Sequence, residues 1–394
     1  MPAWSCLVVC SLAALLAACQ EPATCTCDGG PGDGQVGDSQ VGDSQSPDQG
    51  SGRMQHFGYY LPLAPLGPKL TPAYNYLAEV AGWNTFHLMM PYYNHWGAEE
   101  TAQDAAAVAQ SLGPAFDQSD ALGLQTMMDV MPYFIEGYKE GVEDKLRLAP
   151  CWKSKDLSVK PCWRWPRDLP FLKQQQDRIL GFYVADEPNG WDISAADVAL
   201  IVDTVHQAFP TKPTVAVYLL DGRITTEGKC EPVVPVYPAY SDPLARPNCV
   251  VASSVAPNLD WLSIDSYFLR TRADVSDYWA KPILKLAEDF PGKPILPVVE
   301  AFNDYLHQFS GCAISHYPNA EQQGWYADSV SKELGSVEVI GFLYFAYAFY
   351  FERLTWAQCA KDQLHPPYAE RPDGARYYPD AIAQAKALFK TYHP

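Results

Sequence analysis

The stretch ILGFYVADEP (residues 179–188) decides the fold, because it has the length of a buried strand and then changes abruptly to acidic residues. Ser194 is a typical helix N-cap, and the segment after it repeats apolar residues at helical spacing: Val198, Ile201, Val202, Val205 and Phe209. The run TVAVYL (214–219) then has the length and composition of a second strand. A strand, a helix and a strand in this order form a βαβ unit, which predicts a parallel sheet.

The same alternation extends in both directions along the chain. Eight short apolar, β-branched or aromatic runs qualify as strands: 57–61, 85–90, 125–130, 179–185, 214–219, 261–265, 295–299 and 339–345. Helices begin at Thr71-Pro72 and after Asn319, and a last helix over 380–392 closes the ring. This pattern predicts an α/β protein, a (β/α)8 TIM barrel. A doubly wound open sheet is the alternative, but the turn LPLAP (61–65) lacks the glycines with which such a sheet binds phosphate.

The N-terminus indicates export. Residues 1–18 fit a signal peptide, because an uncharged apolar stretch begins at Leu7 and is too short to span a bilayer. The run LAAC (16–19) resembles the bacterial lipobox, which implies that Cys19 is lipidated and anchors the mature chain in a membrane. Gln20 in place of aspartate favours the outer membrane or the cell surface. Because no Lys or Arg precedes the apolar stretch, an ordinary signal peptide cut elsewhere is the alternative.

A tether separates this N-terminus from the rest of the chain. Residues 19–53 consist largely of small and polar residues, and VGDSQ occurs twice in tandem at 36–40 and 41–45. Such a segment has almost no apolar surface to bury, so we expect a disordered linker. From residue 54 to residue 394 the composition is that of one globular domain.

Charge and composition narrow the class of partner. The formal net charge is −18, and no cluster of Lys and Arg stands out, so we expect no nucleic-acid partner. Aromatic residues make up 13% of the chain, which suits a site where rings stack on flat ligand faces. Burial of many of these rings in the core is the alternative explanation of this percentage. Nothing in the sequence indicates an oligomeric state.

Cysteine usage agrees with export. Six cysteines fall in the globular part, and pairing of neighbours along the chain is the simplest expectation: Cys151 with Cys162, Cys230 with Cys249, and Cys312 with Cys359. No Cys-x-x-Cys occurs among them and no His stands at ligand spacing, so we expect disulfides rather than a metal site.

Carboxylates end four of the predicted strands. Strand three carries Asp129, strand four ends in Asp186 and Glu187, strand six ends in Asp265, and strand seven reaches Glu300. The strands of a barrel end at one face, where enzymes of this fold build their sites. Like charges crowded there raise one another's pKa and do not favour stability. The cluster therefore predicts a functional site, and two carboxylates flanking a bond are what glycoside hydrolysis requires.

The chain resembles the large clan of retaining glycoside hydrolases built on this barrel. In that clan the acid/base Glu ends strand four and the nucleophile Glu ends strand seven, which implies these roles for Glu187 and Glu300. The resemblance also implies an oligo- or polysaccharide substrate, no cofactor, and a tyrosine beside the nucleophile, matched here by Tyr267. The sequence departs from the clan in three places. Asp186 replaces an Asn, His87 stands where an Arg is usual, and Tyr347 stands where a Trp is usual.

Further residues are candidates for sugar binding. Asp186, Asp265 and Asp129 offer carboxylates, and the rings of Trp191, Tyr92 and Tyr347 offer platforms, with Tyr93 and Trp96 as similar candidates. The tryptophans near the first cysteine pair either line the cleft or pack beneath the disulfide: Trp152, Trp163 and Trp165.

Other interpretations of the same carboxylates remain open. The alternative for Glu187 is a solvated acid in a loop. The alternative for Glu300 is a structural acid paired with a Lys or Arg. Two further functions fit the same fold. One is a non-catalytic carbohydrate-binding or adhesion lipoprotein, and the other is an enzyme that acts on another linkage through Glu187 with Asp265 or Asp186.

Overall fold

The computed structural model describes most of the predicted barrel, all of it within the unit Gly52–Pro394. The described residues are 54–60, 85–88, 105–121, 123–140, 143–159, 161–191, 193–220, 222–224, 230–232, 250–266, 269, 271–300, 320–345, 369–370 and 376–377. No helix within these ranges is both long enough and apolar enough to cross a bilayer. Several predictions fall outside them: the signal peptide, Cys19, the tether, the helices at 72 and 380, Tyr92, Tyr267, Tyr347, Cys249, Cys312 and Cys359.

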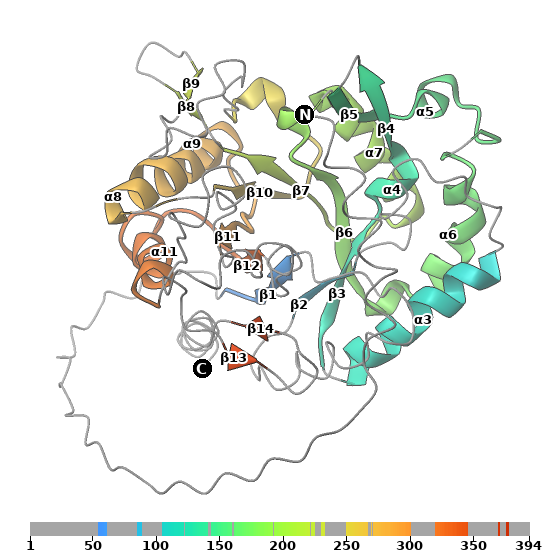
Figure 1. The fold of residues 1–394 in the computed structure, drawn as a ribbon, viewed down its shortest axis with the longest axis horizontal. Coiled ribbons are helices and arrows are strands. Elements are labelled where there is room, and N and C mark those ends of the chain that lie inside the picture. Colours follow the sequence, from blue (N-terminus) through green and yellow to red (C-terminus); the bar gives the residue numbers. More distant parts are fainter. Residues whose placement is uncertain are drawn as a thin grey trace, which may run out of the picture. The chain divides into compact units, whose positions relative to one another are not determined.

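Eight parallel strands form the central sheet (Figure 1). They are β1 (His56–Tyr60), β2 (Thr85–Leu88), β3 (Gln125–Asp129), β6 (Ile179–Asp186), β7 (Thr214–Leu219), β10 (Trp261–Asp265), β11 (Val298–Glu300) and β12 (Gly341–Phe345). Their order is β10-β7-β6-β3-β2-β1-β12-β11. These strands match the eight predicted runs within a few residues at each end.

The two ends of this order meet and close the ring. Leu262 of β10 forms a parallel bridge with Ile295, three residues before β11. The Leu262 N–H donates to the Pro294 carbonyl at 3.0 Å, and the Leu296 N–H donates to the Leu262 carbonyl at 2.8 Å. The prediction of a (β/α)8 barrel is confirmed by this strand order and closure.

Helices lie around the outside of the strands (Figure 1). The α-helices are α3 (Ala105–Ala121), α4 (Met131–Phe134), α5 (Pro150–Ser154), α6 (Arg164–Gln174), α7 (Ala195–Ala208), α8 (Arg272–Val275), α9 (Lys281–Asp289) and α11 (Ala320–Lys332). Shorter helical turns are η4 (Gln176–Arg178), η5 (Pro188–Gly190), η7 (Ala252–Ser254) and η8 (Ser276–Ala280). Three antiparallel pairs leave the barrel: β4 (Ile135–Glu140) with β5 (Glu143–Leu148), β8 (Gly222–Ile224) with β9 (Cys230–Pro232), and β13 (Ala369–Glu370) with β14 (Arg376–Tyr377).

Alternate residues of the strands enter two separate apolar layers. The inner cluster fills the barrel and consists of Met127, Tyr183, Val215, Val217, Leu296, Val298, Ile340 and Leu343. The neighbouring strand residues, such as Met128 and Tyr218, belong to the outer cluster with the helices. This alternation follows from the two-residue period of a strand. It also sets which strand-end side chains belong to the barrel interior.

The N-terminus of α7 forms as the sequence predicts. The Ser194 hydroxyl accepts a hydrogen bond from the Asp197 N–H at 3.2 Å, and the Asp197 carboxylate accepts one from the Ser194 N–H at 3.2 Å. This reciprocal capping box satisfies two N–H groups that the first helical turn leaves without partners. It fixes where the chain resumes a helix after the strand-four acids.

The first predicted cysteine pair is present, and the tryptophans beside it pack in the core. Cys151 and Cys162 form a disulfide. The centroids of the Trp152 and Phe134 rings lie 4.5 Å apart, and the Trp152 indole N–H donates to the Tyr133 carbonyl at 2.9 Å. Trp165 is likewise buried. Both rings are therefore buried in the core, as one of the two alternatives predicted.

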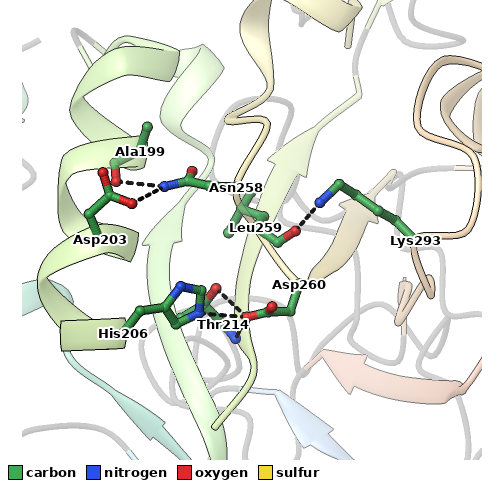
Figure 2. Close-up of polar contacts among 8 residues, drawn as sticks. All are labelled: Ala199, Asp203, His206, Thr214, Asn258, Leu259, Asp260 and Lys293. Atoms are coloured by element: carbon green, nitrogen blue, oxygen red, sulfur yellow. Dashed lines mark hydrogen bonds and ion pairs between the residues drawn. The ribbon is translucent and has the colours of Figure 1, made fainter. Parts of the chain in front are cut away.

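A polar network ties the N-terminal ends of β7 and β10 to α7 (Figure 2). One carboxylate oxygen of Asp260 accepts from the Thr214 N–H at 2.8 Å and the Thr214 hydroxyl at 2.9 Å, and lies 2.8 Å from the His206 imidazole. The Asn258 amide donates to the Ala199 carbonyl at 2.9 Å. This network lies at the barrel end opposite the strand-end acids, where residues of this fold serve stability.

We expect Asp260→Ala to lower the free energy of unfolding by about 1–3 kcal/mol, because Thr214 is fully buried and its N–H would lose its acceptor. Urea unfolding at neutral pH measures this difference. Asp203→Ala is the matched control, since Asp203 is an exposed acceptor of the same network and its loss should cost little. Equal stability of the two variants would contradict the role given to Asp260.

Candidate active site

The end of β6 departs from regular strand geometry at the acidic residues. The pairing with β7 shifts register between Tyr183 and Ala185, and β6 ends at Asp186. Glu187 follows with φ 45° and ψ 46°, in the left-handed region. Among the described non-glycine residues, only Lys155 shares a positive φ. This conformation costs a non-glycine residue about 1–2 kcal/mol, so surrounding contacts must hold it in place.

Hydrogen bonds to β7 provide those contacts. The Glu187 N–H donates to the Val217 carbonyl at 2.8 Å, and the Glu187 carbonyl accepts from the Gly190 N–H at 2.8 Å. The Asn189 side chain then bonds to both polar groups of one residue. Its amide donates to the Leu219 carbonyl at 2.7 Å and accepts from the Leu219 N–H at 3.0 Å. The turn that carries Glu187 is thereby fixed to the end of the neighbouring strand.

Asp186 is held from inside the barrel. It is half-buried, and its Oδ1 accepts a hydrogen bond from the Tyr183 hydroxyl at 2.7 Å. Tyr183 is 1% exposed and belongs to the inner cluster. The sequence predicted Asp186 as a sugar-binding carboxylate. A buried phenol therefore holds the Asp186 carboxylate from the barrel interior.

Asp129 ends β3 and is fully buried. It pairs in register with Tyr183 of β6, and its Oδ1 accepts from the Met131 N–H at 2.8 Å. Burial raises the pKa of Asp129 well above its ordinary value. The Met131 hydrogen bond opposes this shift, and the charge of Asp186 adds to it. Two of the predicted carboxylates thus lie close enough across the β3–β6 pair to interact electrostatically.

The other two strand-end acids occupy the predicted positions on the chain. Asp265 is the last residue of β10, is fully buried, and pairs in register with Leu219. Glu300 is the last residue of β11, where its backbone pairs with Phe345 of β12. Within the described ranges, no three His, Cys, Asp or Glu side chains come close enough to hold a metal ion.

Trp191 is the described aromatic candidate with the most open ring. It follows η5 directly, its N–H donates to the Pro188 carbonyl at 3.2 Å, and it is 39% exposed. An exposed indole four residues after Glu187 is available to a ligand that reaches the end of β6. Tyr92, Tyr267 and Tyr347 lie outside the described residues.

Two residues that shape this site could not be identified from the sequence. Tyr183 reads in the sequence as one more apolar residue of a buried strand, and only the structure reveals its hydrogen bond to Asp186. Asn189 stands in a Pro-Asn-Gly turn, a pattern that predicts a turn but no partner. Its partner Leu219 lies 30 residues further along the chain. A register prediction for β6 against β7 would have been needed to find it.

No protein-family model matches the sequence, and no curated protein sequence matches it. The structure has a TM-score of 0.49 with a β-glucosidase from Thermotoga maritima in complex with cyclophellitol, at 11% identity over 82% of this chain and 86% of that enzyme. It has the same TM-score with a glycoside hydrolase family 5 mannosidase from Rhizomucor miehei, at 11% identity over 83% and 89% of the two chains.

An exo-β-1,4-mannosidase from an Opitutaceae bacterium gives a TM-score of 0.48 at 13% identity over 86% of this chain. The match spans 59% of the length of that enzyme. These identities are low and the TM-scores lie below 0.5. The barrel and the site are therefore assigned from the strand order, hydrogen bonds and burial of this chain.

Proposed function

We propose that this protein is a glycoside hydrolase in which Glu187 is the acid/base and Glu300 the nucleophile. The observation that carries the proposal is the left-handed backbone of Glu187, fixed by a hydrogen bond to Val217 near the C-terminal end of a barrel strand. Strain of this kind persists where function requires a side chain in one position. The C-terminal end of the strands is also where barrels of this fold place their chemistry.

The surroundings of Glu187 suit a proton donor. Asp186 stands next to it and accepts from Tyr183, so a carboxylate charge already occupies this part of the site. In the proposed role Glu187 carries a proton until the substrate is cleaved. In the proposed first step Glu187 gives its proton to the leaving oxygen, and in the second step it takes a proton from the incoming water.

Glu300 completes the proposed reaction. Glu300 is the last residue of β11, two residues after Val298, which belongs to the inner cluster. The Glu300 carboxylate would attack the anomeric carbon as the bond to the leaving oxygen breaks. Water would then release the sugar with its original configuration. This retaining course predicts carboxyl groups about 5–5.5 Å apart, whereas an inverting enzyme needs about 6.5–9.5 Å.

The proposed substrate is an oligo- or polysaccharide. Trp191 would offer its exposed ring to a sugar face, and the buried Asp129 and Asp265 would support the polar side of the site. Tyr92, Tyr267 and Tyr347 belong to the same proposed set on the sequence pattern. The proposal also includes export and attachment to the cell envelope through lipidated Cys19, which would hold the enzyme near extracellular polymers.

A hydrolysis screen tests the proposed function. The full-length mature protein is incubated with a panel of soluble polysaccharides, oligosaccharides and aryl glycosides, and proton NMR follows the anomer that is released first. We expect cleavage of at least one glycoside with retention of configuration. Glycan binding without hydrolysis of any panel member would contradict the enzyme and support the carbohydrate-binding lipoprotein.

A further inference from the structure

Two aspartates end the neighbouring strands that lead to Glu187. Asp129 ends β3 and Asp186 ends β6, and the two strands pair in parallel with Asp129 opposite Tyr183. The Val130 N–H donates to the Tyr183 carbonyl at 2.9 Å, which continues this pairing to the strand ends. Tyr183 also donates its hydroxyl to Asp186. One tyrosine therefore links the backbone beside Asp129 to the side chain of Asp186.

The two oxygens of Asp129 differ. Oδ1 accepts the Met131 N–H at 2.8 Å. Oδ2 is buried and has no hydrogen-bond partner in the described part of the chain. An ionised oxygen in that position would have neither solvent nor a donor to stabilise it. A protonated oxygen would carry no charge and would avoid this cost.

We propose that Asp129 and Asp186 share one negative charge, with a proton on Oδ2 of Asp129 and an ionised carboxylate at Asp186. Asp129 is then a positioning residue, because its neutral carboxyl group fixes the charge state of Asp186 beside Glu187. The effect on catalysis rests on the proposed hydrolase function. The proton itself is a property of the folded chain and can be measured without a substrate.

The groups around Asp129 agree with this assignment. On β6, Tyr183 pairs with Asp129 in backbone register, and the charge of Asp186 acts on Asp129. On β2, which pairs with the other edge of β3, His87 stands opposite Met127. Near α4, the buried Arg164 guanidinium donates to the Pro132 carbonyl, and no cation acts on Asp129 among the described residues.

The shared proton explains how the site accommodates an aspartate where the resembling enzymes have asparagine. Asp186 brings a charge that an amide would not bring. Because Asp129 next to it stays neutral, the pair carries a single charge, and Asp186 keeps the acceptor that the Tyr183 hydroxyl requires. A carboxylate at Asp186 with no second charge behind it can accept a hydrogen bond from Glu187 or from a sugar hydroxyl.

The stability of the fold against pH tests the proposal. A raised pKa in the folded state means that the folded chain keeps a proton that the unfolded chain releases above about pH 3.9. Stability from this group is therefore lost as pH rises from that value toward the folded pKa. Asp129→Asn keeps the oxygen that accepts from Met131 but has no proton to lose. We expect the unfolding constant of the wild type, relative to D129N, to rise by up to about tenfold per pH unit.

The measurement is urea unfolding of the full chain at intervals between about pH 5 and pH 8. Asp168→Asn is the matched control for loss of a buried carboxylate, because Asp168 is equally buried and its carboxylate is paired with Arg167. If the ratio of the wild-type unfolding constant to that of D129N stays constant over this pH range, Asp129 is ionised in the folded chain and the proposal is overturned.

Two further readouts keep the test decisive. If D129N does not fold, infrared spectroscopy of Glu187→Gln at neutral pH should still show the carbonyl band of a protonated carboxylic acid, and absence of the band overturns the proposal. If a glycoside is cleaved, D129N should shift the pH profile of kcat. The two proposals can fail separately. If no glycoside is hydrolysed but the ratio of unfolding constants still rises with pH, the proposed function is refuted and the proton on Asp129 stands.

Discussion

Replacing Glu187 with glutamine is expected to lower turnover by about 100- to 10,000-fold, with little change in the free energy of unfolding. The amide has the shape of the carboxylic acid, and the backbone bonds of residue 187 to Val217 and Gly190 do not involve the side chain. The loss should depend on the leaving group. Aryl glycosides whose phenolate leaves without protonation should lose much less, and kcat for a pair of substrates that differ in leaving-group acidity measures this.

The matched variant for the second carboxylate is Glu300→Ala, which should abolish turnover on every glycoside. A small external nucleophile such as azide should restore cleavage in this variant and yield a product of inverted configuration, because it attacks where Glu300 would. Normal turnover in either variant would contradict the assignment of both glutamates. An azide product of inverted configuration from E187Q, with no rescue of E300A, would exchange their roles.

Strand boundaries followed from sequence where both faces of a strand are buried. The runs 214–219 and 261–265 coincide with β7 and β10, because each is a short apolar segment bounded by polar or turn residues. The hairpin of β4 and β5 was not predicted. Its sequence IEGYKEGVEDKLRL is highly charged and lacks the apolar alternation that marks a strand, and a Glu136–Arg147 pair joins it across the strands.

The site was predictable as a set of acids but not as a geometry. Strand-end position brought Asp129 and Asp186 together, since parallel strands end at the same face of the barrel. The backbone of Glu187 was not predictable, because a residue before proline favours an extended conformation and this one is left-handed. Tertiary hydrogen bonds from β7 override the local preference. Such bonds leave no pattern in the sequence around residue 187.

The dependence of Glu187 on those bonds predicts a large effect at a residue that carries no chemistry. Asn189→Ala should lower kcat by about 100-fold, because a displacement of about 1 Å at a catalytic group costs this much. The Asn189 amide holds both polar groups of Leu219, and without it the strained turn is free to relax toward a right-handed or extended backbone. KM should change much less than kcat, since substrate-binding groups elsewhere on the barrel face are untouched. Steady-state kinetics on the best glycoside separates the two constants.

Loss of stability alone would also lower activity. The comparison therefore needs a second asparagine whose side chain makes a similar set of hydrogen bonds. Asn258 is suitable, because its amide bonds to the Ala199 carbonyl and to Asp203 at the far end of the barrel. Both alanine variants should lower the free energy of unfolding by about 0.5–1.5 kcal/mol for each hydrogen bond lost. Only Asn189→Ala should lower kcat at a temperature where both proteins are folded. Equal retention of kcat would mean that the turn keeps Glu187 in place without its amide clamp, and the strain at residue 187 would then need another cause.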